Sequence, residues 1–286
     1  MNMLKTEPAN LRANRTPDIP SFRVLGVRVN SVQIPEVIQI LEQWIRERDR
    51  ARYVAVTGMH GVSISREDPQ FRKVLDDADL VVADGMPLVW IGRWRGHQQM
   101  KRRACGPELF ETFCRETGSK YRHFFYGGAP GVADLVARSL QERHRIQIAG
   151  TYCPPFRPLT EDEEAEVQAI VAAAAPDILW VGLSTPKQEK WMYEHRDRIQ
   201  VPVMLGVGAA FDMSCGRLKR APEWMCEHGF EWFFRLVIEP ERLWRRYFVN
   251  GSKFVWAVCV EDVVPRMFHR SIGNATSPSS VKQELS

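Results

Sequence analysis

The chain has 286 residues, of which 44% are apolar, 26% charged and 10% aromatic. This composition is typical of a globular protein with a hydrophobic core, and it excludes a fibrous chain or one that is disordered over most of its length. The formal net charge of +4 fits an anionic ligand or surface but is too small for a dedicated nucleic-acid-binding protein, so no nucleic-acid partner is expected.

The cysteine spacing and the hydropathy indicate the compartment of the protein and whether the chain spans a membrane. None of the six cysteines forms a Cys-x-x-Cys pair or has a histidine at zinc-finger spacing, so we interpret them as reduced thiols of a cytosolic protein. The first twenty residues are polar and contain three prolines, so we do not expect a signal peptide. The apolar stretches are shorter than the roughly 18 residues that cross a bilayer.

Short β-branched runs alternate with helical patterns from about Phe22 to Phe211. This alternation predicts an α/β fold with a mostly parallel, Rossmann-like sheet, and strands that are apolar on both sides predict helices on both faces. The expected strands are Phe22–Val29, Tyr53–Thr57, Leu80–Ala83, His123–Tyr126, Ile146–Thr151, Ile178–Gly182 and Val203–Val207. The expected helices are Pro35–Glu47, Pro69–Leu75, Met86–Trp94, Glu108–Thr117, Gly131–His144, Glu161–Ala174 (with a Thr160/Glu163 capping box) and Pro186–Arg196.

The pattern changes after Asp212, where no further strand is expected. Pro222 to Pro265 reads as consecutive helices rich in tryptophan, phenylalanine and arginine. We therefore expect an α/β domain over 21–212 and a C-terminal helical appendage over 213–270. The polar, aperiodic ends, 1–20 and 271–286, are expected to be disordered tails.

Asp84 is the first candidate for catalysis. Ligands of open parallel sheets bind beyond the carboxyl ends of the strands, and Asp84 directly follows Leu80–Ala83. A carboxylate at that place can act as a general base. The alternative is a helix N-cap, a common role of aspartate.

Other strand ends supply candidate substrate-binding residues, namely Thr57, His60, Gly127, Gly128, Gln188, Glu189 and Gly208. The glycines at 127 and 128 could offer backbone N–H groups to an anion or form only a tight turn. Gln188 and Glu189 open a helix, where such residues are also common for electrostatic reasons. Arg102 and Arg103 could neutralise a leaving phosphate or be ordinary surface residues.

Three common types of binding site are not expected in this chain: a P-loop, a dinucleotide-binding site and a metal site. The glycine segment lacks the Lys-Ser/Thr pair of a P-loop, and Phe211 stands where a dinucleotide fingerprint after Gly206 needs a small residue. The D-x-D pattern Asp77-Ala78-Asp79 precedes its strand, which places it at the wrong edge of the sheet. No metal site and no cofactor are therefore predicted.

The segment from Lys219 to Arg246 mixes arginines, among them Arg235, Arg242, Arg245 and Arg246, with many aromatic residues. Amphipathic helices of this composition can lie at a membrane surface. Alternatively, the aromatic side chains pack onto the sheet. An exposed hydrophobic surface on these helices would also favour a homo-oligomer.

Several short motifs occur in a characteristic order: T-x-x-H at Thr57, D-G at Asp84, R-x-x-G at Arg103, G-G-x-P-G-V at Gly127, P-K-Q-E at Pro186, G-V-G-A-x-F-D at Gly206, R-A-P at Arg220, E-W-x-x-R at Glu231 and E-P-x-R at Glu239. Together they resemble the WecG/TagA/CpsF family of bacterial glycosyltransferases over about Phe22 to Tyr247.

The resemblance implies an inverting transfer of a sugar from a UDP-sugar to a lipid-linked oligosaccharide acceptor carried on polyprenyl pyrophosphate. Asp84 matches the proposed catalytic base, and Thr57, Arg103 and Gln188 match pocket residues. The C-terminal arginines match an appendage that docks on the membrane and closes the active site. The expected location is the cytoplasm, peripherally bound to the inner face of the cytoplasmic membrane.

One departure bears on the donor sugar. Many members have asparagine two residues after the threonine, where this chain has Met59. In this respect the chain resembles the exopolysaccharide branch of the family. We therefore predict transfer of a hexose or N-acetylhexosamine in exopolysaccharide biosynthesis. The alternative is a non-catalytic UDP-sugar-binding or lipid-binding subunit of a polysaccharide assembly complex.

Overall fold

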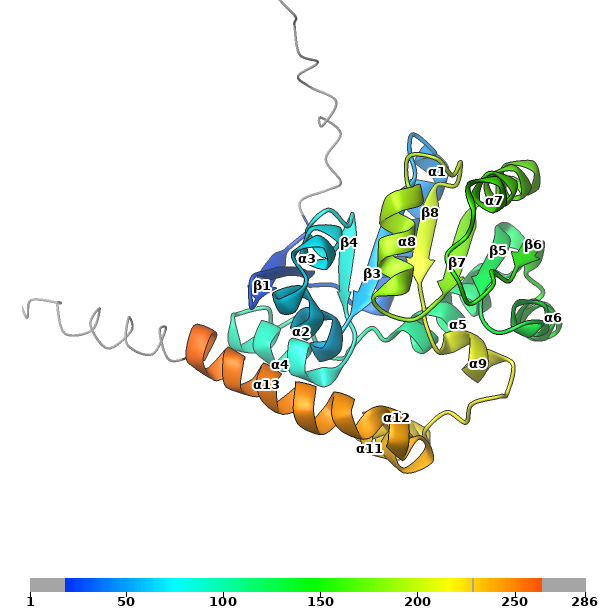
Figure 1. The fold of residues 1–286 in the computed structure, drawn as a ribbon. Coiled ribbons are helices and arrows are strands. Elements are labelled where there is room, and N and C mark those ends of the chain that lie inside the picture. Colours follow the sequence, from blue (N-terminus) through cyan, green and yellow to red (C-terminus); the bar gives the residue numbers. More distant parts are fainter. Residues whose placement is uncertain (1–18, 228, 264–286) are drawn as a thin grey trace, which may run out of the picture.

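The computed structural model describes residues 19–227 and 229–263. It confirms the predicted α/β class: six parallel strands form a sheet in the order β4-β3-β8-β7-β5-β6 (Figure 1). The strands are β3 (Arg52–Thr57), β4 (Leu80–Ala83), β5 (Arg122–Gly127), β6 (Gln147–Tyr152), β7 (Ile178–Gly182) and β8 (Val203–Gly206). Each lies within a residue or two of its predicted range.

Helices cover both faces of the sheet, as predicted. One face packs on α2 (Met59–Glu67), α3 (Pro69–Asp76), α4 (Met86–Trp94), α7 (Glu161–Ala174) and α8 (Lys187–His195), and the other on α1 (Ile34–Glu47), α5 (Gly106–Thr117), α6 (Val132–His144) and α9 (Ala210–Ser214). Successive strand residues point to opposite faces, so Tyr53 and Ala55 enter one core while Val54 and Val56 enter the other. Burial on both sides explains why these strands are apolar throughout.

The prediction of one strand over Phe22–Val29 was wrong. The segment forms a separate antiparallel hairpin of β1 (Ser21–Val24) and β2 (Val27–Asn30). The connecting residues Leu25 and Gly26 have φ angles of 47° and 83°, the left-handed conformation of a tight hairpin turn. Asn30 holds the hairpin to the main sheet, because its Oδ1 accepts a hydrogen bond of 2.9 Å from the Val81 amide.

A local capping signal predicts the start of α7, whereas the start of α2 has no such signal. The Thr160/Glu163 capping box at the start of α7 is confirmed, with the Thr160 amide donating to Glu163 at 2.8 Å and the Glu163 amide donating to Thr160 Oγ1 at 3.3 Å. Helix α2 was not predicted. It starts directly after β3 with Gly58 as its N-cap and no capping side chain, so the sequence carries no start signal there.

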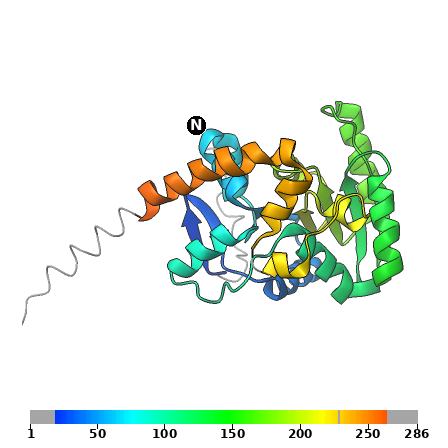
Figure 2. The same cartoon turned by 90° about the horizontal axis from the view of Figure 1, so that it is seen from below.

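The predicted C-terminal helices are present. They comprise α10 (Glu223–Glu227), α11 (Glu231–Ile238), α12 (Pro240–Trp244), η2 (Arg245–Asn250), α13 (Gly251–Ala257) and η3 (Val258–Val263). They run beneath the carboxyl ends of the strands, and the view from below shows the final helix crossing in front of α2 (Figures 1 and 2). Phe254, Ala257 and Val258 are buried in the core on that side.

The structure does not test the predicted domain limits or the predicted terminal tails. The proposed limits of the α/β domain and the appendage remain predictions, and the predicted tails fall mainly on residues 1–18 and 264–286, outside the described part of the chain. Within the described ranges, no helix combines the length and the apolar character needed to cross a membrane.

Candidate active site

The order of the strands creates a crevice at the carboxyl edge of the sheet. Strand β8 continues into α9 on one face, whereas its neighbours β3 and β7 continue into α2 and α8 on the other. Adjacent strands whose connections leave toward opposite faces leave a gap between them, and ligands of α/β proteins bind in such gaps.

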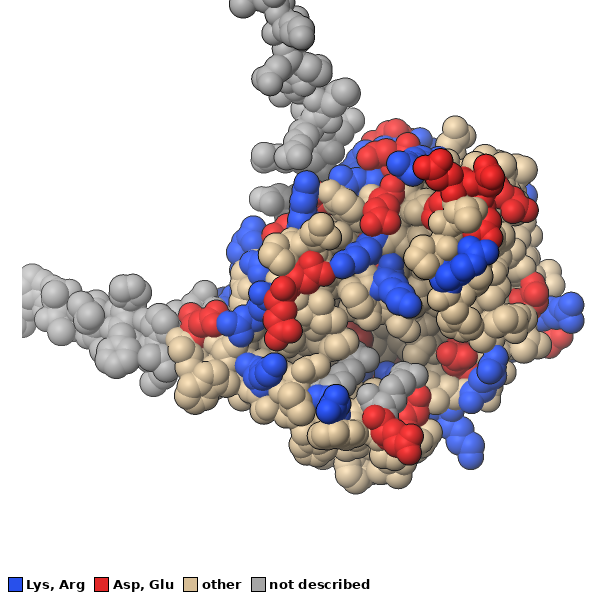
Figure 3. Space-filling view, viewed as in Figure 1, with Lys and Arg blue, Asp and Glu red and all other residues tan. Residues whose placement is uncertain are grey.

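A cavity of about 880 Å³ lies at this crevice. Its inner wall comes from the ends of β3, β4 and β8 and the start of α8, and its outer wall comes from the C-terminal helices. Figure 3 shows the surface hollowed between these two parts, while acidic side chains gather over α7, away from the hollow. Of the predicted site residues, the cavity is lined by His60, Asp84, Arg103, Gln188, Gly208 and Arg235.

Asp84 reaches the cavity from the turn between β4 and α4. Its amide donates a hydrogen bond of 2.8 Å to the Thr57 carbonyl, which ties the ends of the two strands together. Gly85, with φ of 114°, redirects the chain and is itself the N-cap of α4. Asp84 therefore does not occupy the N-cap position, and the capping interpretation does not apply.

The end of β3 approaches Asp84 very closely. A Cβ atom at Gly58 would lie 2.2 Å from the Asp84 carbonyl oxygen, so only glycine fits. Thr57, just before it, is buried, and its Oγ1 has no hydrogen-bond partner among the described residues. Thr57 does not itself line the cavity, whereas His60 does, from the first turn of α2.

Gln188 is held in one orientation from both ends of its amide. Its Oε1 accepts a hydrogen bond of 3.0 Å from the Gly208 amide, and its Nε2 donates to Glu189 Oε1 at 3.0 Å. Thr185 Oγ1 donates to the same Glu189 oxygen at 2.8 Å. Because one Nε2 hydrogen remains, Gln188 can present a donor to a ligand in the cavity.

Glu189 lies behind Gln188 and does not line the cavity. Its side chain is completely buried, and its Oε2 has no hydrogen-bond partner among the described residues. Burial raises the pKa of Glu189, although the hydrogen bonds from Thr185 and Gln188 act in the opposite direction. Its geometry is that of a residue that positions Gln188.

Arg103 connects the α/β part of the chain to the C-terminal helices. Its guanidinium forms an ion pair with Glu231 at the start of α11, and both side chains are largely buried. Glu231 lines the cavity as well. The role of Glu231 was not predicted, because nothing in the E-W-x-x-R motif indicates a partner 128 positions earlier.

Two predicted residues lie away from the cavity. Gly127 ends β5, two strands from β8, and neither it nor Gly128 lines the cavity. A Cβ at Gly127 would lie 2.8 Å from the Gly182 carbonyl oxygen, and one at Gly128 would lie 2.9 Å from Val132. The role of these glycines in substrate binding remains a prediction.

Four arginines of the C-terminal helices were predicted to dock on the membrane and close the active site, and the structure describes the side chains of two of them. Arg235 on α11 lines the cavity, and Arg245 is exposed with its guanidinium 5.5 Å from the centre of the Trp244 ring. The side chains of Arg242 and Arg246 lie outside the described part of the structure.

The D-x-D pattern lies at the amino end of β4, opposite the cavity, as predicted. There the Asp79 carboxylate accepts a 3.0 Å hydrogen bond from the Tyr53 amide and pairs with Arg50. Across 19–227 and 229–263, no group of three or more histidine, cysteine, aspartate or glutamate side chains is arranged to hold a metal ion.

Sequence comparison identifies relatives of this chain. Residues 22–267 match the glycosyl transferase WecG/TagA/CpsF family. An N-acetylglucosaminyldiphosphoundecaprenol N-acetyl-beta-D-mannosaminyltransferase from Bacillus spizizenii is 28% identical over 79% of this chain and 86% of its own length. The enzyme of the same name from Bacillus subtilis is 28% identical over 71% of this chain and 77% of its own. The chain therefore belongs to the WecG/TagA/CpsF family and is a glycosyltransferase.

Proposed function

We propose that this glycosyltransferase moves a hexose or N-acetylhexosamine unit from a UDP-sugar to an acceptor linked to polyprenyl diphosphate, with inversion at the anomeric carbon. The observation that carries the proposal is the placement of Asp84 in a cavity that also contains Arg103 and the fixed amide of Gln188. The two Bacillus relatives, whose names specify a diphosphoundecaprenol acceptor, support the acceptor class.

In the proposed reaction, Asp84 accepts the proton of the acceptor hydroxyl while the hydroxyl oxygen attacks the anomeric carbon. The new carbon–oxygen bond forms as the bond from the anomeric carbon to the UDP oxygen breaks, and UDP leaves with the electron pair. Negative charge grows on the departing diphosphate, and the guanidinium of Arg103 can stabilise it. The proposal needs no cofactor, because cationic side chains supply the positive charge.

In the proposed reaction, Gln188 orients the substrate. Since its carbonyl oxygen is occupied by the Gly208 amide, the free N–H of its side chain can donate to a sugar hydroxyl or a phosphate oxygen. A fixed donor costs less free energy to use than a mobile one, because its conformational freedom is already lost.

We place the reaction in exopolysaccharide biosynthesis on the ground that Met59 replaces the asparagine that many members have at that position. Met59 lines the cavity, so the substitution removes a polar group from the site. An apolar side chain there favours a donor sugar that does not need a hydrogen bond from the asparagine amide. Assaying a panel of UDP-sugars would distinguish a hexose donor from an N-acetylated one.

We further propose that the enzyme works at the inner face of the cytoplasmic membrane. Many large apolar side chains of the C-terminal helices are exposed, including Phe248 at 60%, Val255 at 56% and Trp256 at 72%, and Trp90 on the adjacent α4 is 58% exposed. These four side chains also line the cavity, so the exposed apolar surface is continuous with the site. Exposed apolar surface of this kind next to arginines is typical of a membrane-contacting helix. A homo-oligomer would bury the same surface and remains a prediction.

The decisive experiment replaces Asp84 with asparagine, which keeps the size of the side chain and removes its ability to take a proton. Transfer from a panel of UDP-sugars to lipid acceptors extracted from bacterial membranes should fall by about 10²–10⁴-fold, with UDP binding retained. Asp134→Asn is the matched control, because Asp134 is exposed on α6, outside the cavity. Turnover by the Asp84 variant within threefold of the parent would reject the proposed base.

A further inference from the structure

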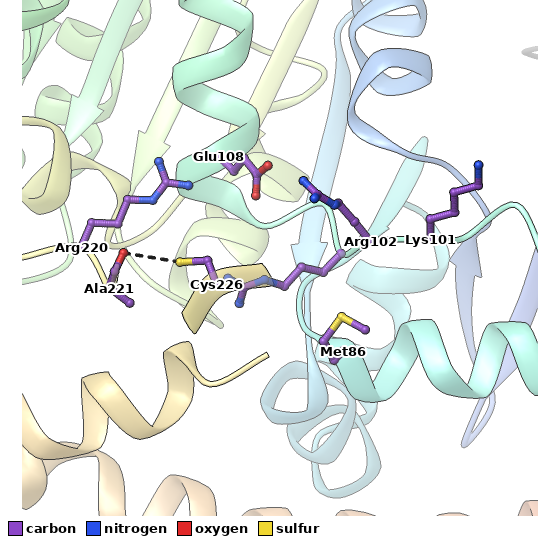
Figure 4. A pocket seen from close by; sticks show the side chains of 8 residues that line it. Met86, Lys101, Arg102, Glu108, Arg220, Ala221 and Cys226 are labelled. Carbon is purple, nitrogen blue, oxygen red and sulfur yellow. Dashed lines mark hydrogen bonds between the residues drawn. The ribbon is translucent and has the colours of Figure 1, made fainter. Parts of the chain in front are cut away.

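A second cleft of about 370 Å³ adjoins the main cavity, and the two share Met86 and Arg103. Lys101, Arg102, Glu108 and Arg220 also line it, and we call it the basic cleft. Arg102 and Arg220 enter from opposite sides and point toward Glu108, whereas Lys101 is directed outward (Figure 4). Of the residues that line it, the proposed transfer reaction uses only Arg103.

The loop that carries Lys101 and Arg102 is fixed by a single side chain. Gln33 Oε1 accepts hydrogen bonds from the Lys101 amide at 3.2 Å and from the Arg102 amide at 2.9 Å, while its Nε2 donates to the Arg102 carbonyl at 2.7 Å. Just beyond, the Ala104 amide donates to the Ala83 carbonyl at 3.0 Å. The basic side chains are thus presented by a backbone that is already ordered, which lowers the entropic cost of binding.

Cations outnumber carboxylates among the described residues that line the basic cleft. These residues include four cations and one carboxylate, that of Glu108. Arg103 is engaged with Glu231. Arg220 is exposed and makes no hydrogen bond or ion pair with the residues that the structure describes. A guanidinium that lines a concave site attracts anions, and its planar fork matches two phosphate oxygens at once.

We propose that the basic cleft binds a diphosphate group, with Arg220 as its principal contact and Arg102 opposite. The inference rests on the proposed function, in which the donor and the acceptor are both diphosphate esters. Because the cleft and the cavity share Met86 and Arg103, the remaining part of a molecule whose diphosphate is held there can extend toward Asp84.

The test measures binding to the full chain by calorimetry, with inorganic pyrophosphate, UDP and farnesyl diphosphate as separate probes. Arg220→Gln should weaken pyrophosphate binding by about tenfold, the loss expected for one charge-assisted contact. Arg220→Lys keeps the charge without the fork and should give an intermediate loss. Arg217→Gln is the matched control, because Arg217 is an exposed arginine in the same segment that pairs with Asp212 at 4.0 Å outside the cleft.

The probes also identify the source of the diphosphate. Weaker binding of farnesyl diphosphate with UDP unchanged assigns the cleft to the lipid acceptor, and the reverse pattern assigns it to the donor. Equal affinities of Arg220→Gln and the parent for all three probes would overturn the proposal. None of these measurements needs turnover, so rejection of Asp84 as the base would leave them interpretable.

Discussion

The carboxyl edge of the sheet has two halves that look alike in sequence and differ in structure. At β4, β3 and β8, the glycines at 58, 85, 206 and 208 border an open cavity. At β5 and β7, Gly127 packs against Gly182, and Gly182 packs in turn against the ring of Phe211. Each half contains a glycine that a close backbone approach requires, Gly58 in one and Gly127 in the other, but only one half leaves room for a ligand.

The difference comes from side-chain packing. Adjacent strands continue to opposite faces of the sheet both around β8 and at β5 and β7, which lead into α6 and α8. At the ends of β5 and β7, however, the ring of Phe211 from α9 packs against Gly182 and Phe125. A glycine turn after a strand therefore indicates a backbone conformation, and only the side chains packed around it tell whether that turn borders a site.

The largest expected effect compares one glycine from each half. Gly58→Ala and Gly127→Ala both force a Cβ against a carbonyl oxygen, at 2.2 Å and 2.8 Å, and each should destabilise the fold by about 1–3 kcal/mol. Gly58→Ala also displaces Asp84, so its transfer rate per folded molecule should fall about 100-fold. Thermal unfolding and turnover are measured together; equal turnover in the two variants would contradict the division into halves.

The second prediction concerns His123 on β5, in the half that lacks the cavity. Burial lowers the pKa of His123 to about 4, while the unfolded chain binds a proton near pH 6.5. The folded state is therefore fully favoured above pH 6.5 and loses about 3 kcal/mol as the pH falls toward 4.

His123→Gln tests this assignment, because glutamine can still accept the 3.0 Å hydrogen bond from Trp180 Nε1 and does not titrate. Urea unfolding at a series of pH values should show a flatter acid dependence for the variant. An unchanged slope between pH 6.5 and 4 would assign the acid sensitivity to other groups.

The third prediction concerns Glu189, which supports Gln188 in the half with the cavity. Removing its carboxylate in Glu189→Ala leaves the buried Gln188 amide and the partly buried Thr185 hydroxyl without this acceptor and should cost about 1–3 kcal/mol. Glu189→Gln keeps an acceptor, so it should restore most of the stability and the Michaelis constant for the donor. A purely structural role would leave that constant unchanged in both variants.

The pH dependence of Glu189 has the opposite sign to that of His123. Since burial raises its pKa, its contribution to stability is present below its ordinary range near 4.5 and is lost as the pH rises through the raised value. The stability of the parent relative to Glu189→Gln should therefore decrease with rising pH.

The smallest expected effect compares two exposed aromatic residues. Trp256 on α13 lines the cavity and is 72% exposed, and Phe156, in the loop after β6, is 85% exposed and lies outside the cavity. Trp256→Ser should weaken binding to vesicles of phosphatidylglycerol and phosphatidylcholine by about tenfold, as for the loss of one buried aromatic side chain. Phe156→Ser should bind like the parent, and equal losses would exclude a membrane face confined to the C-terminal helices.

Much of the fold could be predicted from the sequence because its signals are local. The apolar runs of β4 and β7 and the capping box of α7 define their elements without reference to the rest of the chain. The hairpin was missed because Leu25 adopts a left-handed conformation that its side chain does not suggest. Helix α2 was missed because it has no capping residue.

The candidate site was predictable only in part. Asp84, Gln188 and Gly208 follow strands that end at the cavity, so the parallel topology brings them together. The pairing of Arg103 with Glu231, the placement of Glu189 behind Gln188 and the fixing of Lys101 and Arg102 by Gln33 each join residues from different elements. Such pairings depend on tertiary packing, which a single sequence does not encode in any short pattern.

The burial of Phe254 and Ala257 determines where the outer wall of the cavity is attached. These residues belong to the hydrophobic core, so lifting α13 away would expose apolar surface at a cost of about 2–3 kcal/mol for the phenylalanine alone. Among the described side chains from Arg217 to Asn250, the buried apolar ones are Ala221 and Leu243. Detaching the C-terminal helices from the sheet is therefore most costly at α13.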